Sequence, residues 1–214
     1  MTLYWDRSAE STQDKYMGNI TNGADLYDFE GYKIYRATDF EFNDAYNITD
    51  GDGNPTFLEP YVQNGVRAQW DLVDGKSGWH PVDLNGIKFY LGDDTGLTHS
   101  YVDHNVVNGQ RYYYAVVSYD YGGDLSNNII PSDSPMKLRV NPLTGAVSLG
   151  PNVVEVVPSP PSAGFVDASF PGDQVDHVAG ASSGEVFLEI VDPQMVQDAH
   201  TYQITFDDTL FLNQ

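Results

Sequence analysis

The stretch from Tyr101 to Asp120 most constrains what this chain can fold into. Two runs rich in Tyr and Val flank a turn signal at Asn108-Gly109. The second run has the two-residue period of a β-strand, with side chains that point alternately to opposite faces. One face would carry Tyr112, Tyr114 and Val116, and the other Tyr113, Ala115 and Val117. The pattern predicts a strand, a tight corner and a second, longer strand.

Tyr112 stands directly after this corner and opens the longer strand. A tyrosine in that place, with its hydroxyl bonded back to the corner, is typical of the tyrosine corner of immunoglobulin-like sandwiches. Together with residues 3–6 and 31–36, the stretch resembles a fibronectin type III domain. The resemblance implies an all-β sandwich in which Trp5 and Tyr112 are structural. It also implies a non-catalytic module of an extracellular surface protein or filament.

The resemblance assigns the strands of the sandwich. Strands B, C, E, F and G are expected at residues 2–6, 31–37, 99–103, 111–120 and 136–140. On strand C, Tyr32 and Ile34 would face the core, and Lys33 and Tyr35 the outside. Residues 7–28 are expected to form a long polar loop. The family's strand A is absent, so strand B would leave an open sheet edge.

The segment between strands C and E, at about 38–97, is several times longer than the family pattern requires. It contains three X-Gly pairs between apolar runs, a combination that favours type I′ hairpins: Asn64-Gly65, Asp74-Gly75 and Asn85-Gly86. Strands are predicted at 60–63, 66–73, 79–84 and 87–91. We therefore expect a β-hairpin insertion that packs on the sandwich.

These patterns divide the chain into three parts. The fibronectin type III-like domain is expected at 1–142, a Pro-rich linker at 143–165 and a partial second β-unit at 166–214. Within the last part, residues 184–191 and 200–206 are predicted strands. Both ends of the chain read as cut from a longer polypeptide.

Charge and composition limit the partners. With 31 acidic and 10 basic residues, the formal net charge is −21, and nothing suits binding to nucleic acid or to anionic membranes. No apolar run is long enough for a membrane span, and no cysteine is present for disulfides or thiolate sites. Such a surface favours solubility or cation binding, and we expect an extracellular, bacterial setting.

The best metal candidate is the segment 49–55. Asp50, Asp52 and Asn54 offer oxygen ligands at alternating positions, as calcium loops do. The match to an EF-hand then ends, because Pro55 and Tyr61 stand where glycine and glutamate belong. Two interpretations stay open: a polar turn, or a calcium site completed by remote acids, for instance Asp39, Asp44 or Glu59. Asp120 with Asp124, and Asp93 with Asp94, are further acidic clusters, whereas Asp25 and Asp28 are expected to be solvated.

Exposed aromatic residues suggest a second kind of site. Tyr35, Tyr113 and Tyr119 would lie on the outer face of neighbouring strands, as a platform for a sugar or a protein. Trp70 and Trp79 either join such a glycan site or form a small core within the insertion.

No catalytic motif is present, and the five histidines lack the spacing of metal ligands. The sequence therefore predicts a structural or adhesive module that binds other protein chains, either by β-strand addition at the open edge or as part of a longer protein. The alternative is an accessory carbohydrate-binding module of a secreted enzyme.

Overall fold

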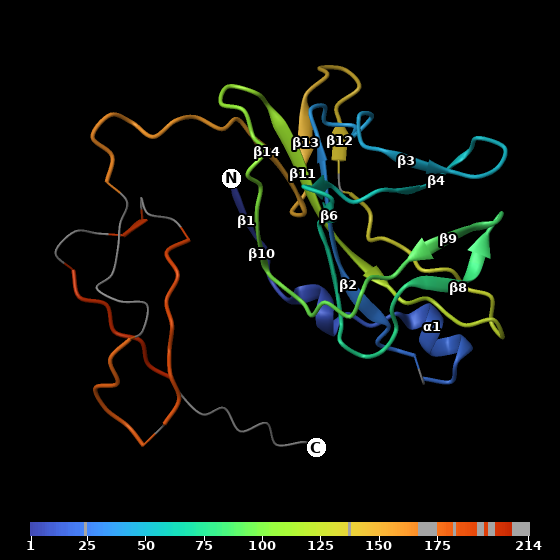
Figure 1. Ribbon diagram of the computed structural model, residues 1–214, viewed down its shortest axis with the longest axis horizontal. Helices are drawn as coiled ribbons and strands as arrows, with labels where there is room; N and C mark the ends of the chain where they lie inside the picture. The colour runs from blue at the N-terminus through green and yellow to red at the C-terminus, as the bar shows by residue number, and fades with distance from the viewer. Residues whose placement is uncertain are drawn as a thin grey trace. The chain divides into compact units, whose positions relative to one another are not determined.

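The computed structural model describes residues 1–23, 25–136, 138–166, 175–181, 183–191, 195–196 and 200–206. The chain divides into two compact units, Met1–Pro160 and Pro161–Gln214. Every strand pairing in the described residues is antiparallel, so the expected all-β class is confirmed (Figure 1).

All named elements belong to the first unit. Two short helices precede the second strand: the 3₁₀-helix η1 (Ser8–Ser11) and α1 (Lys15–Ile20). The strands are β1 (Thr2–Tyr4), β2 (Phe29–Ala37), β3 (Asn47–Thr49), β4 (Pro55–Leu58), β5 (Val62–Gln63), β6 (Val66–Arg67), β7 (Gln69–Asp71), β8 (Trp79–Leu84), β9 (Ile87–Tyr90), β10 (Ser100–Val102), β11 (Tyr112–Asp120), β12 (Leu138–Val140), β13 (Val147–Leu149) and β14 (Val153–Val156).

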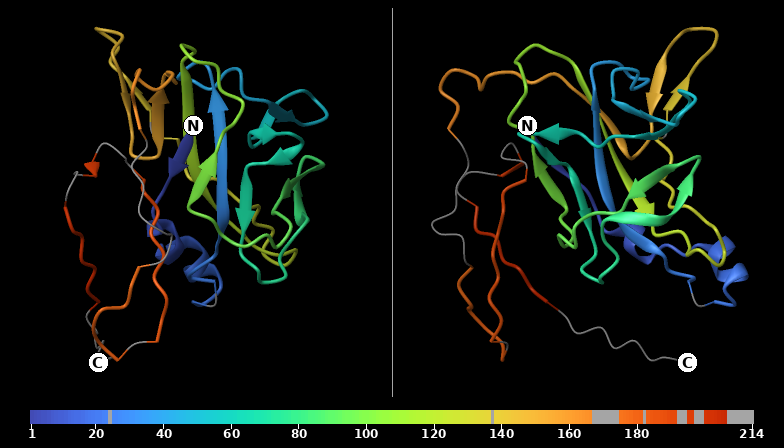
Figure 2. Two further views of the ribbon diagram at one scale, coloured as in Figure 1. Left: turned by 60° about the vertical axis from the view of Figure 1, so that its left-hand side comes forward. Right: turned by 45° about the vertical axis from the view of Figure 1, so that its right-hand side comes forward.

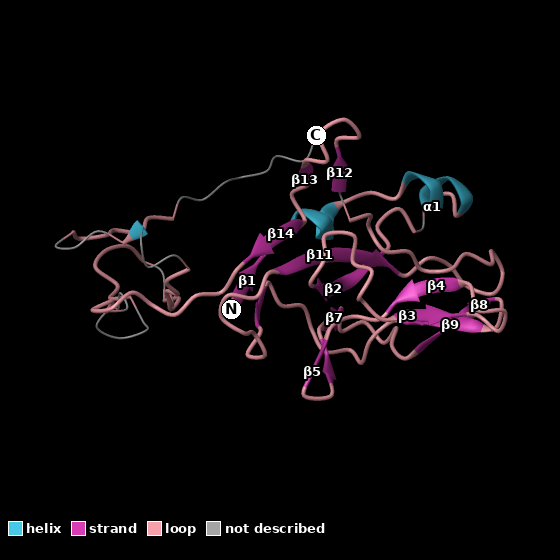
Figure 3. Cartoon of the chain, turned by 90° about the horizontal axis from the view of Figure 1, so that it is seen from above, coloured by secondary structure: helices cyan, strands magenta, loops and turns pink. Residues whose placement is uncertain are grey.

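A four-stranded sheet in the order β14-β11-β2-β7 forms the centre of the unit. Its two long strands, β2 and β11, pair from Tyr113 opposite Ala37 to Asp120 opposite Phe29. A separate pair, β1 with β10, lies on one side of this sheet, and the hairpins β3–β4 and β8–β9 lie on the other (Figure 2). The view from above shows the same order, with β11 and β2 between the outer elements (Figure 3).

The alternation predicted for β11 is confirmed. Tyr112 and Tyr114 pack in one buried cluster with Leu3 of β1 and Ile34 of β2. Their neighbours on β11 point to the opposite face and pack in a second cluster with Tyr35. Each face of the central sheet therefore has its own core.

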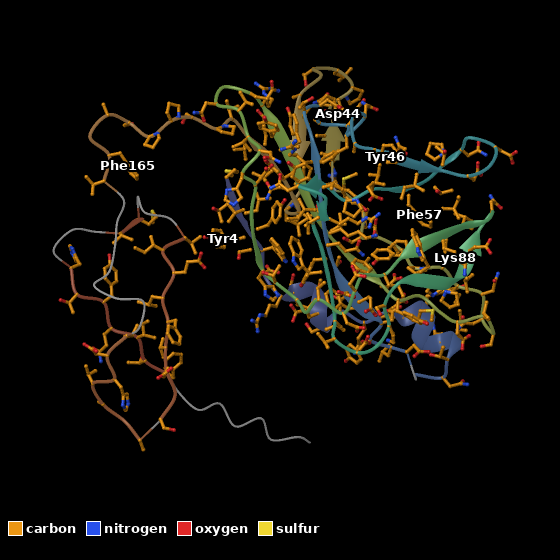
Figure 4. The ribbon with its side chains drawn as sticks, in the orientation of Figure 1. Tyr4, Asp44, Tyr46, Phe57, Lys88 and Phe165 are labelled. Carbon is orange, nitrogen blue, oxygen red and sulfur yellow. The ribbon has the colours of Figure 1, made fainter. Side chains whose placement is uncertain are left out.

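The insertion covers the second face. Phe42, from the loop after β2, is buried against Tyr35, and Leu58 of β4 packs at the edge of the same cluster. Phe89 and Leu91 are buried around Tyr119 in a third cluster. In Figure 4, Phe57 and Lys88 lie on these hairpins, and Tyr4 lies on β1 across the sheet. The expectation that Lys33 and Tyr35 face the outside is therefore wrong, because the insertion, with its hairpins, buries both side chains.

Two of the three expected type I′ turns are present. Asn64 and Gly65, between β5 and β6, have φ angles of 54° and 83°, and Asn85 and Gly86, between β8 and β9, have 53° and 84°. Positive φ at both central positions is what this turn requires. At Asp74-Gly75 the glycine alone has a positive φ, so a different turn forms.

The expected strand G is misplaced. Residues 138–140 do form a strand, but β12 pairs with β13, and the strand beside β11 is β14. Both β13 and β14 lie in the range that we expected to be a linker, 143–165. The prolines that suggested a linker instead flank β14, at Pro151 and Pro158, where they interrupt no pairing.

The loop expected at 7–28 contains both short helices. Asp14 explains the second helix, because its carboxylate accepts the backbone N–H groups of Tyr16 and Met17 and caps α1.

In the second unit, the described residues of 184–191 contain an isolated bridge position at Phe187, and 200–206 contain no strand. The two expected strands are therefore not formed. A two-stranded hairpin that joins no larger sheet is marginally stable in water.

Candidate functional site

The outer edge of β1 is a candidate interaction site. Met1 and Asp103 exchange two backbone hydrogen bonds, of 2.9 and 2.8 Å, and the Trp5 N–H donates to the His99 carbonyl at 3.0 Å. In an antiparallel pair the bonded positions alternate. The backbone groups of Thr2 therefore point away from β10, and in the described part of the chain β1 pairs with that one strand.

The opposite edge of this pair is closed by one side chain. The Gln63 amide donates to the Val102 carbonyl at 3.1 Å and accepts the His104 N–H at 2.7 Å. It thus bonds the outward carbonyl of Val102 and the N–H of His104, just beyond β10, as a neighbouring strand would.

The edges of the central sheet are also protected. Beside β7, the Asp71 N–H donates to the Thr95 hydroxyl, and the Gln69 amide donates to the carbonyls of Tyr90 and Leu91. On β14, Glu155 pairs with Arg111 at 3.3 Å, and charged residues discourage edge pairing. Among the edges of these two sheets, β1 is therefore the one best suited to accept another strand.

A second feature is a cluster of three carboxylates at one end of the central sheet. Asp28 directly precedes β2, and Asp120 ends β11 opposite Phe29. Asp14 joins them from the start of α1, where its N–H donates to the Leu26 carbonyl at 2.8 Å. One oxygen from each of the three carboxylates lies within 4.8 Å of the others.

Hydrogen bonds orient two of these carboxylates, whereas one oxygen of the third has no partner among the described residues. The Ser132 N–H and hydroxyl donate to the two oxygens of Asp120, at 2.8 and 2.6 Å. Asp14 caps α1 through Oδ1. The side chain of Asp28 is 7% exposed, and its Oδ2 is buried with no hydrogen-bond partner among the described residues.

The electrostatics reflect this crowding. Burial, followed by repulsion from Asp120 and Asp14, raises the pKa of Asp28 to about 6. Burial also raises the pKa of Asp120, against the hydrogen bonds from Ser132. The cluster borders a surface pocket of about 550 Å³ that Gln13, Phe29 and Ser118 also line. The expectation that Asp28 is simply solvated is therefore wrong.

The loop expected to bind calcium forms a self-contained turn. Asp50 accepts the N–H groups of Asp52 and Asn54, at 3.0 and 2.8 Å, and the amide of Asn54 also donates to it. These bonds, led by the one from the Asn54 backbone, hold the pKa of Asp50 below its usual value. This geometry fits the polar-turn interpretation.

The remote acids considered for that loop are engaged elsewhere. Asp39 accepts N–H groups within its own loop, Asp44 accepts the N–H and hydroxyl of Thr38, and Glu59 pairs with Arg67 at 2.6 Å. Among the described residues, Asp50 belongs to no group of three or more acidic or histidine side chains close enough to bind one metal ion.

The expected aromatic platform is buried. Tyr35, Tyr113 and Tyr119 are 1%, 5% and 2% exposed, because the insertion and the β12–β13 hairpin cover their face. Trp70 packs between Trp5 and Tyr101 on the sandwich side and so forms no core of the insertion. Trp79 is 60% exposed, edge-on to Tyr90.

The two residues expected to be structural lie where they were placed. Trp5 packs against Tyr32 and Trp70, with ring centroids 5.9 and 5.7 Å away. The hydroxyl of Tyr112 accepts the backbone N–H of Val107 at 3.0 Å, which is the bond expected of the corner.

Sequence reasoning missed two buried charged residues of β2. Lys33 bonds Asp133 at 3.2 Å and lies 3.5 Å above the Phe89 ring, and burial lowers its pKa. Glu30 is fully buried, and burial raises its pKa to about 8. The available signal was a charged residue on each face of a strand whose other residues, apart from Gly31 and Arg36, are apolar or aromatic.

Comparison with protein-family models, curated proteins and solved structures finds no significant match to this chain. Within the described residues, no helix has the length and apolar character needed to cross a bilayer.

Proposed function

We propose that residues 1–160 form a fibronectin type III-like structural module that assembles by β-strand addition at the open edge of β1. The strand pairing supports this proposal. In it, β1–β10 would be the B–E pair of that family, and β14-β11-β2-β7 would be strands G, F, C and C′. The Tyr112–Val107 bond adds the corner of the same family.

The assembly proposal depends mainly on one observation: side chains or charges cover some sheet edges, but not the outer edge of β1 at Thr2. Side chains or charges protect the outer edges of β10, β7 and β14, whereas Thr2 directs its backbone groups outward. Unpaired edges recruit strands from other chains, and proteins normally block them. The outward backbone groups of Thr2 are a position with which a partner strand can pair.

The partner that the chain itself offers is the segment 184–191 of a second copy. Its sequence, Gly-Glu-Val-Phe-Leu-Glu-Ile-Val, contains the strand-favouring residues Val186, Phe187, Ile190 and Val191, and Phe187 is 64% exposed. The Pro-rich run 157–164 precedes it and would act as a semi-rigid tether. Because donor and acceptor are different surfaces, each copy can accept one strand and donate another, and this head-to-tail contact produces a filament.

The extracellular, non-catalytic role belongs to the same proposal. The net charge of −21 favours solubility, and a chain without cysteine folds without disulfides in any redox setting. The carbohydrate-binding alternative depended on five aromatic residues. Tyr35, Tyr113 and Tyr119 are buried, Trp70 packs against Trp5 and Tyr101, and Trp79 is exposed, so the platform that we expected is not formed and we do not pursue this alternative.

The test is the molar mass of the full chain, measured by light scattering over a range of concentrations. The wild-type chain should grow beyond a dimer as concentration rises. Thr2→Pro removes an outward N–H from β1 and should keep the chain monomeric. The matched control is Glu155→Pro, which removes an outward N–H from the edge of β14 and should assemble as the wild type does. A wild-type chain that is monomeric at all concentrations contradicts the proposal.

A further inference from the structure

The register of the central sheet brings two acids close together. Asp28 and Asp120 lie at the same end of paired strands, linked by the 2.8 Å bond from the Tyr121 N–H to the Asp28 carbonyl. Asp120 is opposite Phe29, so the two acids are diagonal neighbours, and like charges this close repel each other. Asp14 adds a third negative charge within 4.8 Å.

The basic residues nearby do not neutralise this group. Lys33 is committed to Asp133, at 3.2 Å, and to the rings of Phe89 and Tyr119. Lys15 borders the pocket from the first turn of α1, and none of the ion pairs found in the described residues joins it to the three acids. No basic residue in the described part of the chain therefore forms an ion pair with these three carboxylates.

Asp28 gives an independent indication of a ligand. Its Oδ2 is buried and unpartnered, in a side chain that is 7% exposed and that faces the other two acids. A buried carboxylate oxygen without a donor costs free energy that a folded protein normally avoids. A bound cation would supply the missing partner.

We propose that Asp14, Asp28 and Asp120 bind a calcium ion. Three carboxylates supply up to six oxygen atoms, and calcium takes six to eight oxygen ligands, with water completing the shell. No histidine or thiol takes part, which disfavours zinc and copper, and magnesium prefers to keep most of its own water. Ser132 and the first turn of α1 already hold two of the carboxylates in place.

The ion would join three parts of the chain that are distant in sequence. Asp14 belongs to the turn that begins α1, Asp28 to the entry of β2, and Asp120 to the end of β11. Calcium at this point would fasten the segment 12–27 to the end of the central sheet. The site is independent of the β1 edge and of the assembly proposed there.

The test is calorimetric titration of the chelator-treated full chain with calcium chloride, together with thermal melts. We expect one calcium site, and a melting temperature that rises with the logarithm of free calcium above the dissociation constant. Asp28→Asn keeps the side-chain shape and should abolish both responses. Its own melting temperature without calcium should equal or exceed that of the wild type, because a repelled charge has been removed.

The matched control is Asp50→Asn, which alters the acidic loop suggested by the sequence and should leave calcium binding unchanged. Loss of binding in this variant and not in Asp28→Asn would overturn the assignment. So would the absence of heat and of any thermal shift at millimolar calcium. Magnesium binding as tight as calcium binding would also contradict the proposed ion.

Discussion

The Tyr112 hydroxyl and the Val107 N–H, 3.0 Å apart, close the corner between β10 and β11. The bond spans the turn at Asn108-Gly109 and fixes where β11 begins. From that start, alternate residues of β11 supply the two cores on either face of the central sheet. The pairing of β11 with β2 begins at the next residue, Tyr113 opposite Ala37.

Tyr112→Phe should reduce the free energy of unfolding by about 1 kcal/mol, the usual net contribution of one hydrogen bond. The matched control is Tyr101→Phe, because the Tyr101 hydroxyl is buried without a partner among the described residues. That variant should be neutral or stabilising. Urea denaturation of both variants measures the difference, and equal effects would contradict the corner.

Asp103 should be the most sensitive carboxylate of the sandwich core. It is fully buried and accepts bonds from Arg36 and Tyr114, both at 2.8 Å, and from the Asn105 N–H. Burial acts to raise its pKa, but these bonds outweigh it and lower the pKa below 3.8. A depressed folded-state pKa stabilises the fold above the unfolded value, and this contribution is lost as pH falls through the folded value.

Asp103→Asn should therefore lower the free energy of unfolding at pH 7 by roughly 2 kcal/mol or more. The difference from the wild type should shrink as the pH falls below the ordinary range of an aspartate. Asp52→Asn, an exposed acid at the tip of a hairpin, is the control and should change stability little. Denaturation curves at pH 7 and pH 3 give the answer, and a constant difference would refute the role assigned to the charge.

Gly86→Ala isolates the backbone requirement of a type I′ turn. Gly86 has a φ of 84°, and nothing within 4 Å would contact an added Cβ, so strain of the left-handed conformation is the whole effect. The cost should be about 1 kcal/mol. Gly51→Ala is the control. An added Cβ at Gly51 also contacts nothing within 4 Å, but the φ of Gly51 is not positive, so this substitution should be neutral. Thermal melts of the pair check this, and equal melting temperatures would contradict the turn.

Tyr113→Ala distinguishes a core residue from a binding platform. Truncation of a buried aromatic residue leaves a cavity and should cost about 3 kcal/mol or more. Tyr46→Ala is the control, because Tyr46 is 73% exposed and should tolerate the change. Chemical denaturation measures both, and a Tyr113 variant as stable as the wild type would mean that this face is open.

Local patterns predicted much of the fold. The alternation in β11, the tyrosine corner and the Asn-Gly turns depend on neighbours in sequence, and each formed as expected. The pairing of β11 with β14 was not predictable in the same way. A short Val-rich strand between prolines resembles a linker until β11 supplies its hydrogen bonds.

The sites were harder to predict because they depend on contacts distant in sequence. Tyr35 and Tyr113 were expected outside, since nothing local indicated that the insertion would cover their face. Asp14, Asp28 and Asp120 have no common spacing, and the register of β2 with β11 brings the last two together. The acidic loop at Asp50 had ligand-like spacing, but its groups bond one another.

Strand exchange between copies is tested most directly by mixing two single variants of the full chain. Thr2→Pro blocks the acceptor edge and keeps the donor segment, whereas Leu188→Pro interrupts the donor segment and keeps the edge. Each variant alone should be monomeric by light scattering. Their equimolar mixture should form dimers and nothing larger, because only one interface can form. A mixture that stays monomeric, while the wild type assembles, would show that assembly uses another surface and would contradict strand addition at β1.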